Sequence, residues 1–450
     1  MAEFYHSVTL NEEKCVGCTN CIKRCPTQAI RVREGKAQII SERCIDCGEC
    51  IKVCANHAKV AVTDPLESIK RFKYPIALPA PTLYAQFQGV HQPEPIIASL
   101  FRLGFVDVFE VARAAEIVSY AISRAMREED RPKPVISSAC PAILRLIQVS
   151  FPALLDNVID FVSPMEAAAK IAKEEYAQKH GVDKADVGVF FITPCAAKMT
   201  AVKSPVGQEK SHVDGVIAIK DVYAQMRAAM KQGFSPLEID RASVVGIKWA
   251  IPGGEVEAVG IKSSLCVDGI DNVINVLEAI EDARFRNLTY FEGLACVNGC
   301  LGGPLTVENS FVAKNRLRSV MNRTLQKTVQ RREIFEDAVQ TLRMTRPIEP
   351  SDALQLSGTM KDGDKTVPGT FAWADGTVKP SAGSYEAAWK FTPTDSDTYA
   401  EADGTVSITV EKASPAGNPK YTAITSSGKK LSDAALAVND KWPEGTVKWV

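Results

Sequence analysis

Two four-cysteine runs near the N-terminus constrain this sequence more than any other feature. The first contains Cys15, Cys18, Cys21 and Cys25, and the second, 29 residues later, contains Cys44, Cys47, Cys50 and Cys54. This spacing brings three thiolates onto one four-iron cube while the fourth reaches the other cube. We therefore expect one [4Fe-4S] cluster on Cys15, Cys18, Cys21 and Cys54, and a second on Cys44, Cys47, Cys50 and Cys25. The alternative is zinc, but zinc sites use pairs of cysteines.

The overall composition fits this metal-binding interpretation. All 13 cysteines of the 450-residue chain lie before residue 301, and the formal net charge of −1 excludes a strongly basic nucleic-acid binder. No apolar run reaches the roughly 18 residues of a membrane span. The first residues lack the basic start and apolar core of a signal peptide. We therefore expect a cytoplasmic protein without nucleic-acid or membrane partners, in which thiols stay reduced and bind metals.

The pattern of residues divides the chain into three zones, 1–68, 69–347 and 348–450. The second zone alternates apolar runs with helical patterns, such as a buried strand at 187–193 and a helix at 165–179, and it ends in a basic helical segment at 314–344. This alternation is typical of an α/β fold. The sequence thus predicts a multidomain protein with an α/β (or α+β) middle.

The third zone has no cysteine and contains short alternating runs such as 405–410, with turn signals at Asp362-Gly363 and Asp403-Gly404. These features predict a small antiparallel β-sandwich. The segments 369–373 and 445–449 both begin Gly-Thr and end in Trp. Two interpretations of this similarity are open, a repeated unit and a chance match.

Five cysteines remain in the middle zone. Cys140 precedes Pro141, Cys195 follows Pro194, and Cys296 and Cys300 belong to a segment that ends Gly302-Gly-Pro304. Each thiol alone is compatible with ordinary burial in the core, which is our interpretation of Cys266. Because two clusters are already expected, the four thiols together predict one further cluster.

These three segments resemble the three signature motifs of [FeFe]-hydrogenases, in the same order, and the C-x3-C-x-G-G-x-P ending is the most specific of them. The resemblance covers residues 1 to about 345. It implies a ferredoxin-like two-cluster domain followed by a catalytic domain of two α/β lobes, whereas the third zone resembles bacterial immunoglobulin-like repeats. It also implies a third [4Fe-4S] cluster on Cys140, Cys195, Cys296 and Cys300. Cys300 would bridge to a two-iron unit that carries CO, cyanide and an azadithiolate.

The resemblance also implies roles for other residues. The Lys198 ammonium would donate to one cyanide and the Thr82 hydroxyl to the second, because charged and hydroxyl donors suit an anionic ligand. Further residues at motif positions would form the wall of the pocket: Pro81, Ser163, Pro164, Met165, Thr193, Pro194 and Leu294. For the three prolines, simple turn chemistry is the alternative.

The sequence departs from the family where protons are moved. Active members carry a proton-donating cysteine at the position of Ala139, and alanine has no exchangeable proton. A missing acid–base group of this kind costs roughly 10²–10⁴-fold in rate. Thr193, Ala201 and Leu294 replace other family residues. Ser119 falls where a relay glutamate is expected, and Glu116 lies one turn away.

Retained cluster ligands and a missing proton donor resemble the sensory members of the family. We therefore expect a slow, reversible reaction, 2 H⁺ + 2 e⁻ ⇌ H₂, and a role in hydrogen sensing. The expected partners are H₂, protons, a ferredoxin-like or other redox protein, and the enzymes that insert the two-iron unit. The alternatives are an iron–sulfur assembly scaffold and a plain electron carrier, both without the two-iron unit.

Overall fold

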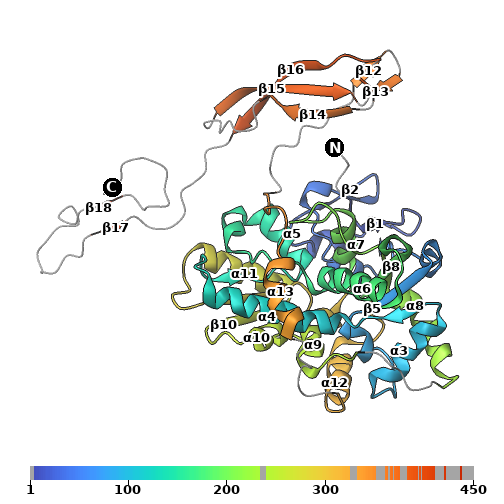
Figure 1. The fold of residues 1–450 in the computed structure, drawn as a ribbon. Helices are drawn as coiled ribbons and strands as arrows, with labels where there is room; N and C mark the ends of the chain where they lie inside the picture. Colours follow the sequence, from blue (N-terminus) through green and yellow to red (C-terminus); the bar gives the residue numbers. More distant parts are fainter. Residues whose placement is uncertain are drawn as a thin grey trace, which may run out of the picture. The chain divides into compact units, whose positions relative to one another are not determined.

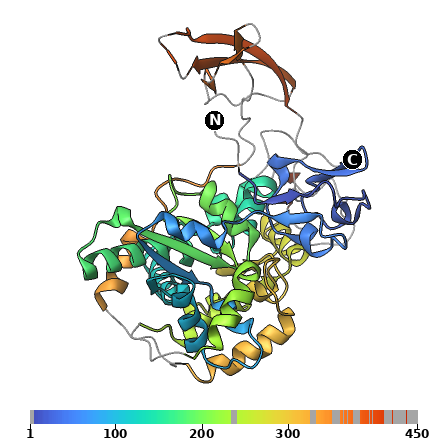
Figure 2. The same ribbon diagram turned by 90° about the vertical axis from the view of Figure 1, so that its right-hand side faces the viewer.

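The computed structural model describes residues 5–233, 240–324 and 332–350, followed by the segments 360–362, 365–367, 369–374, 383–393, 395–396, 398–410, 420–421 and 436–437. The chain forms two compact units, Phe4–Ser351 and a second that contains Asp352–Val450. Figures 1 and 2 show the ribbon in two views. Within the described ranges, no helix has the length and apolar character needed to cross a bilayer.

The first unit begins with a small module of short strands and helices. Strand β1 (Val8–Leu10) pairs with β4 (Lys59–Ala61), and β2 (Ile30–Arg33) pairs with β3 (Lys36–Ile39), both antiparallel. The one-turn helices α1 (Asn20–Lys23) and α2 (Glu49–Lys52) each follow a residue in the left-handed region, Thr19 and Gly48. The four-cysteine runs therefore wrap around two similar turns.

A parallel sheet forms the centre of the unit, with the strand order β6-β5-β8-β9. Its strands are β5 (Tyr74–Pro79), β6 (Asp107–Val108), β8 (Val187–Thr193) and β9 (Gly215–Ala218). The strand predicted at 187–193 is confirmed, and every residue of β8 is buried. A strand with both faces covered has the continuous apolar run seen here.

Helices cover both faces of this sheet (Figure 1). Ile76 and Phe191 pack on one side with α4 (Val111–Glu128) and α6 (Pro164–His180). Ala77 and Phe190 pack on the other side with α3 (Pro93–Arg102), α8 (Ile219–Met230) and α12 (Ser310–Met321). The helix predicted at 165–179 is confirmed as the body of α6. The segment predicted at 314–344 contains two helices, α12 and α13 (Arg332–Thr341), and residues 325–331 between them lie outside the described ranges.

A second parallel sheet has the order β10-β11-β7. Its strands are β10 (Ser264–Asp268), β11 (Tyr290–Leu294) and β7 (Val135–Ile136). Phe291 packs with α5 (Pro141–Ser150) and α11 (Ile270–Glu281), whereas Tyr290 points to the opposite core beside Val259 of α10 (Gly254–Val259). Two helix-covered parallel sheets give the mixed α/β fold that the sequence predicts.

The described strands of the second unit are all antiparallel. They are β12 (Met360–Asp362) with β13 (Lys365–Val367), the sheet β14 (Gly369–Trp373), β15 (Gly383–Pro393) and β16 (Ala402–Val410), and β17 (Lys420–Tyr421) with β18 (Leu436–Ala437). The sandwich stays a prediction, and the segment 445–449 lies outside the described residues.

One turn expected in this unit is wrong. Asp403 and Gly404 lie inside β16, opposite Lys390 and Trp389 of β15. A Cβ atom on Gly404 would lie 2.6 Å from the Trp389 ring. Glycine therefore serves here to admit an indole from the neighbouring strand rather than to reverse the chain.

Candidate metal centres

The eight N-terminal cysteines surround two separate cavities. Cys15, Cys18, Cys21 and Cys54 line the first, which we name the outer site because Cys18 is exposed. Cys25, Cys44, Cys47 and Cys50 line the second, the inner site. Each group thus takes three cysteines from one run and one from the other.

Backbone amides at both sites point at sulfur. The Ala29 amide donates to Cys25 Sγ and the Ala58 amide donates to Cys54 Sγ, each over 3.2 Å. These two cysteines are the fourth members of their runs, so the two halves of the module repeat the same contact. Amide donors aimed at sulfur are typical of the surroundings of iron–sulfur clusters, and the residues therefore fit such clusters.

A third, larger cavity lies where strands of both parallel sheets end. Cys140 follows β7 and caps α5, Cys195 follows β8 and caps α7 (Ala196–Lys203), and Cys296 and Cys300 follow β11. All four thiols line this main cavity, which holds about 980 Å³ of space free of protein atoms. In parallel α/β sheets, ligands bind at such carboxyl ends, and the helix N-termini there favour anions.

Burial sets the chemistry of three of these thiols. It raises the pKa of Cys195 to about 11 and that of Cys296 to about 12, and it also raises the pKa of Cys300. Cys300 has accessible surface because it faces the cavity, although protein surrounds it closely. Thiols that hold their protons so tightly become thiolates only when a cation replaces the proton. Three such thiols and Cys140 around one space fit an iron cluster.

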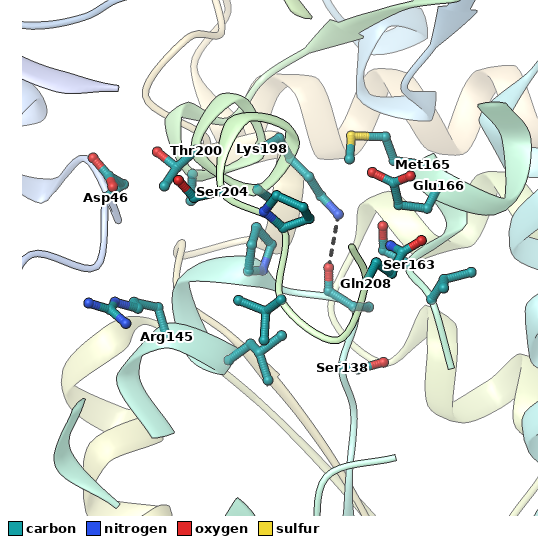
Figure 3. A pocket seen from close by; sticks show the side chains of 18 of the residues that line it. Asp46, Ser138, Arg145, Ser163, Met165, Glu166, Lys198, Thr200, Ser204 and Gln208 are labelled. Atoms are coloured by element: carbon teal, nitrogen blue, oxygen red, sulfur yellow. Dashed lines mark hydrogen bonds between the residues drawn. The ribbon is translucent and has the colours of Figure 1, made fainter. Parts of the chain in front are cut away.

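Lys198 and Thr82 are two of the polar residues that line the main cavity. The Lys198 ammonium donates to the Ala139 carbonyl oxygen over 3.1 Å, as the dashed line in Figure 3 shows. The Thr82 hydroxyl is fully buried and has no hydrogen-bond partner among the described residues. A buried, unpaired hydroxyl costs about 1–3 kcal/mol, so Thr82 fits a cavity that receives a polar ligand.

The structure brings most of the predicted site residues to this cavity. Besides the cysteines, they are Pro81, Thr82, Ala139, Pro164, Met165, Thr193, Pro194, Lys198 and Leu294. Ser163 instead lines an adjoining cavity of about 630 Å³, which shares Ala139, Met165 and Lys198 with the main one (Figure 3).

The two residues aligned with the proton relay do not line either cavity. Ser119 donates to the Ala115 carbonyl and accepts from Trp249 Nε1, and Glu116 accepts from the Ser243 amide over 2.7 Å. Their polar atoms therefore serve packing between α4 and the neighbouring segments.

Two other glutamates, which the sequence reasoning missed, line the main cavity. Glu255 accepts hydrogen bonds from Ser137 Oγ over 2.8 Å and from Tyr290 OH over 2.6 Å. Glu292 accepts from the amides of Gly253 and Val256. Burial, and then the charge of Glu292, raise the pKa of Glu255 far above its usual range, and burial raises that of Glu292. Such groups hold and release protons near neutral pH.

Comparison with known proteins agrees with this arrangement. Residues 73–260 match the family described as iron only hydrogenase large subunit, C-terminal domain, and residues 7–55 match the 4Fe-4S dicluster domain. The chain is 31% identical over 212 residues to the "Periplasmic [Fe] hydrogenase large subunit" of Nitratidesulfovibrio vulgaris, which covers 43% of this chain and 50% of the relative. It is 28% identical over 182 residues to "Iron hydrogenase 1" of Clostridium pasteurianum, with 38% and 32% covered. The chain thus spans half or less of the length of these relatives.

Two further similarities are weaker. A "Cytosolic Fe-S cluster assembly factor NAR1 homolog" of Schizosaccharomyces japonicus is 24% identical over 142 residues, covering 31% of this chain and 27% of that protein. Among solved structures, [FeFe]-hydrogenase HydA1 from Chlamydomonas reinhardtii is 15% identical, with a TM-score of 0.48, covering 63% of this chain and 94% of that one. The sequence matches together support a hydrogenase-like iron–sulfur protein with [FeFe]-hydrogenase homologues.

Proposed function

We propose that this chain is a slow hydrogenase whose reversible reaction, 2 H⁺ + 2 e⁻ ⇌ H₂, serves to sense hydrogen. The observation that carries the proposal is the main cavity, where cysteines from three distant segments meet Lys198 and Thr82. The residues fit a [4Fe-4S] cluster on Cys140, Cys195, Cys296 and Cys300, joined to a two-iron unit through Cys300. When bound, that unit supplies the chemistry of hydrogen cleavage and formation.

The side chains around the cavity bind and orient this cofactor. Lys198 and Thr82 are placed to donate to anionic ligands, and Lys198 would exchange its bond to the Ala139 carbonyl for one to the cofactor. Pro81, Met165 and Leu294 line the cavity with apolar surface, which excludes water and strengthens these hydrogen bonds. Cys300 would provide the attachment of the two-iron unit to the protein.

The proton path explains why the reaction is slow. Ala139 contributes only a methyl group to the cavity wall, so no thiol hands a proton to the cofactor. Glu255 lies on the same cavity and holds its proton because burial raises its pKa. We assign it as the proton reservoir of the site, with Ser137 and Tyr290 fixing its orientation. With this reservoir and no thiol at position 139, turnover is slow, which suits a sensor.

The domain assignment follows from the same proposal. Residues 1–68 carry electrons between the surface and the main cavity, and residues 69–347 hold the cofactor. Residues 348–450 form a β-rich immunoglobulin-like domain. The partners are H₂, protons and a redox protein, and the reaction takes place in the cytoplasm, although one relative is named as periplasmic.

The second candidate is an iron–sulfur assembly scaffold without the two-iron unit. The similarity to the NAR1 homolog favours it. The two candidates differ in what they require of Lys198 and Thr82, since a scaffold has no anionic ligands for these donors.

Hydrogen-dependent reduction of a viologen dye separates the two candidates. Full-length protein, made anaerobically and loaded with the two-iron unit, should reduce the dye slowly under hydrogen. The Cys300→Ser variant should not, while its outer and inner clusters keep their electron paramagnetic resonance signals. No hydrogen-dependent reduction in a fully loaded sample would refute the hydrogenase and favour the scaffold.

A further inference from the structure

The two cluster sites of the N-terminal module differ by one buried charge each. The runs repeat with an offset of 29 residues, so Ile30 corresponds to Lys59 and Gly17 to Asp46. Lys59 and Gly17 line the outer site, whereas Ile30 and Asp46 line the inner site. The repeat therefore places a buried cation at one site and a buried anion at the other. A second acid, Glu49, also lines the inner site where Asn20 lines the outer one, but it is paired with Lys52.

Of the two buried charges, Lys59 is the more unusual. It is the first residue of β4, it is only 2% exposed, and its ammonium has no hydrogen-bond partner among the described residues. Lysines are almost never fully buried unless they are paired. Lys59 lines the outer site with Cys15, Cys18, Cys21 and Cys54, so the anionic cluster that these thiolates would hold is the partner that its position offers. Its charge also acts on Cys50 of the inner site, but Lys59 does not line that cavity.

Asp46 has the opposite character at the inner site. It is 2% exposed and lies between two ligands of that site, Cys44 and Cys47. Its carboxylate accepts from the Val8 amide over 2.9 Å and contacts His6 Nδ1 at 2.7 Å. These contacts hold the negative charge in place beside the cluster.

We propose that Lys59 and Asp46 separate the reduction potentials of the two clusters, so that a single electron rests at the outer site. Each cluster gains one electron on reduction, and no bond forms or breaks. A buried ammonium stabilises the added negative charge and raises the potential of the outer cluster. A buried carboxylate opposes that charge and lowers the potential of the inner cluster.

This order of potentials favours electron flow from the inner cluster to the outer cluster. Cys47 lines both the inner site and the main cavity, whereas Cys18 of the outer site is exposed. The inner cluster therefore lies between the main cavity and the outer cluster, and its lowered potential makes it the less favourable place for an electron. Electrons that have reached the inner cluster run downhill to the outer cluster, where an external acceptor collects them. This consequence rests on the proposed hydrogenase function, but the separation of the potentials does not.

The test is a redox titration of full-length protein that carries its iron–sulfur clusters but lacks the two-iron unit, followed by electron paramagnetic resonance with dithionite as the electron donor. We expect the two N-terminal clusters to be reduced in two steps. The upper step, at the higher potential, belongs to the outer cluster, and the lower step, at the lower potential, belongs to the inner cluster. In Lys59→Met the potential of the upper step should fall by at least about 59 mV, which for one electron is a tenfold loss of electron affinity. In Asp46→Asn the lower step should rise, and Lys59→Arg should keep the wild-type upper step.

Lys23→Met is the matched control, because Lys23 carries the same charge in the same module but is exposed to solvent. Its potentials should equal those of the wild type. Unchanged potentials in both Lys59→Met and Asp46→Asn would overturn the proposal, as would a shift of the lower step alone in Lys59→Met. If Lys59→Met fails to retain iron, Lys59→Arg and Asp46→Asn still decide the proposal. It stands only if Lys59→Arg keeps the potential of the upper step and Asp46→Asn raises the potential of the lower step. Because no two-iron unit is present, a failure here leaves the hydrogenase proposal untouched.

Discussion

Replacing Glu255 by glutamine tests the assignment of the proton reservoir. Glu255 lines the main cavity and binds two hydroxyl groups, Ser137 Oγ at 2.8 Å and Tyr290 OH at 2.6 Å. Glutamine keeps the shape and one acceptor oxygen, and one hydroxyl must turn to accept from the new amide, at a cost of about 1 kcal/mol. Glutamine has no proton to give. We expect a loss of about 10²–10⁴-fold in hydrogen evolution, equivalent to roughly 2.7–5.4 kcal/mol of activation free energy.

Glu255→Gln should lower activity, but it should not lower the stability of the protein. Because burial and Glu292 raise the pKa of Glu255 in the folded state, the folded protein binds more protons at this group than the unfolded chain does. Its contribution to stability is therefore lost as the pH rises from the usual carboxyl range through the raised folded value. Glu255→Gln removes this penalty, so its melting temperature should match or exceed that of the wild type at the alkaline end. An activity loss with retained stability is then chemical rather than structural.

The assay is hydrogen evolution from reduced methyl viologen between pH 6 and pH 9, with equal loading of the two-iron unit checked by infrared spectroscopy. The matched control is Glu116→Gln, which changes a buried glutamate that accepts from the Ser243 amide and lines neither cavity. The wild-type rate should fall as the pH rises through the pKa of Glu255. A wild-type rate in Glu255→Gln, or an equal loss in Glu116→Gln, would refute the assignment.

Three further changes test other parts of the account. Ala139→Cys should raise hydrogen evolution, by up to about 10²–10⁴-fold if the missing thiol limits the rate, and an unchanged rate in fully loaded protein would contradict this. Gly48→Ala should destabilise the protein by about 1–3 kcal/mol in chemical denaturation, because its φ is +78° and a Cβ would lie 2.5 Å from Pro304. Gly35→Ala, with φ +73° but open space around it, should cost less, and equal costs would argue against the contact. Deleting residues 352–450 should leave the iron content unchanged, and loss of the clusters would show that the first unit depends on the second.

The grouping of the N-terminal cysteines around two cavities follows from the sequence because their spacing is local. Three of the four cysteines that line each N-terminal cavity lie within seven residues, as Cys15, Cys18 and Cys21 do, and their spacing determines which cavity they can surround. Cys140 and Cys195 are recognisable because each comes between a strand and a helix, next to a proline that begins or precedes the turn.

The proton and charge network is not predictable in the same way. Glu255 reaches the main cavity because α10 packs against β11, and its partners Ser137 and Tyr290 are far away in the sequence. A single glutamate after two glycines carries no motif, and the resemblance points instead to Ser119 and Glu116, which the fold places elsewhere. Lys59 could be found only by comparing the two halves of the module, where a lysine replaces an isoleucine.

The most direct test of the central claim is an infrared spectrum of the full chain, made anaerobically and loaded with the two-iron unit, recorded under argon and then under hydrogen. Metal-bound CO and cyanide absorb where protein does not. We predict sharp bands in this region that shift when hydrogen is admitted. In Lys198→Met the bands should change position, because a donor to cyanide is lost. No bands in a sample that contains all of its cubane clusters, or bands that ignore hydrogen, would contradict the claim.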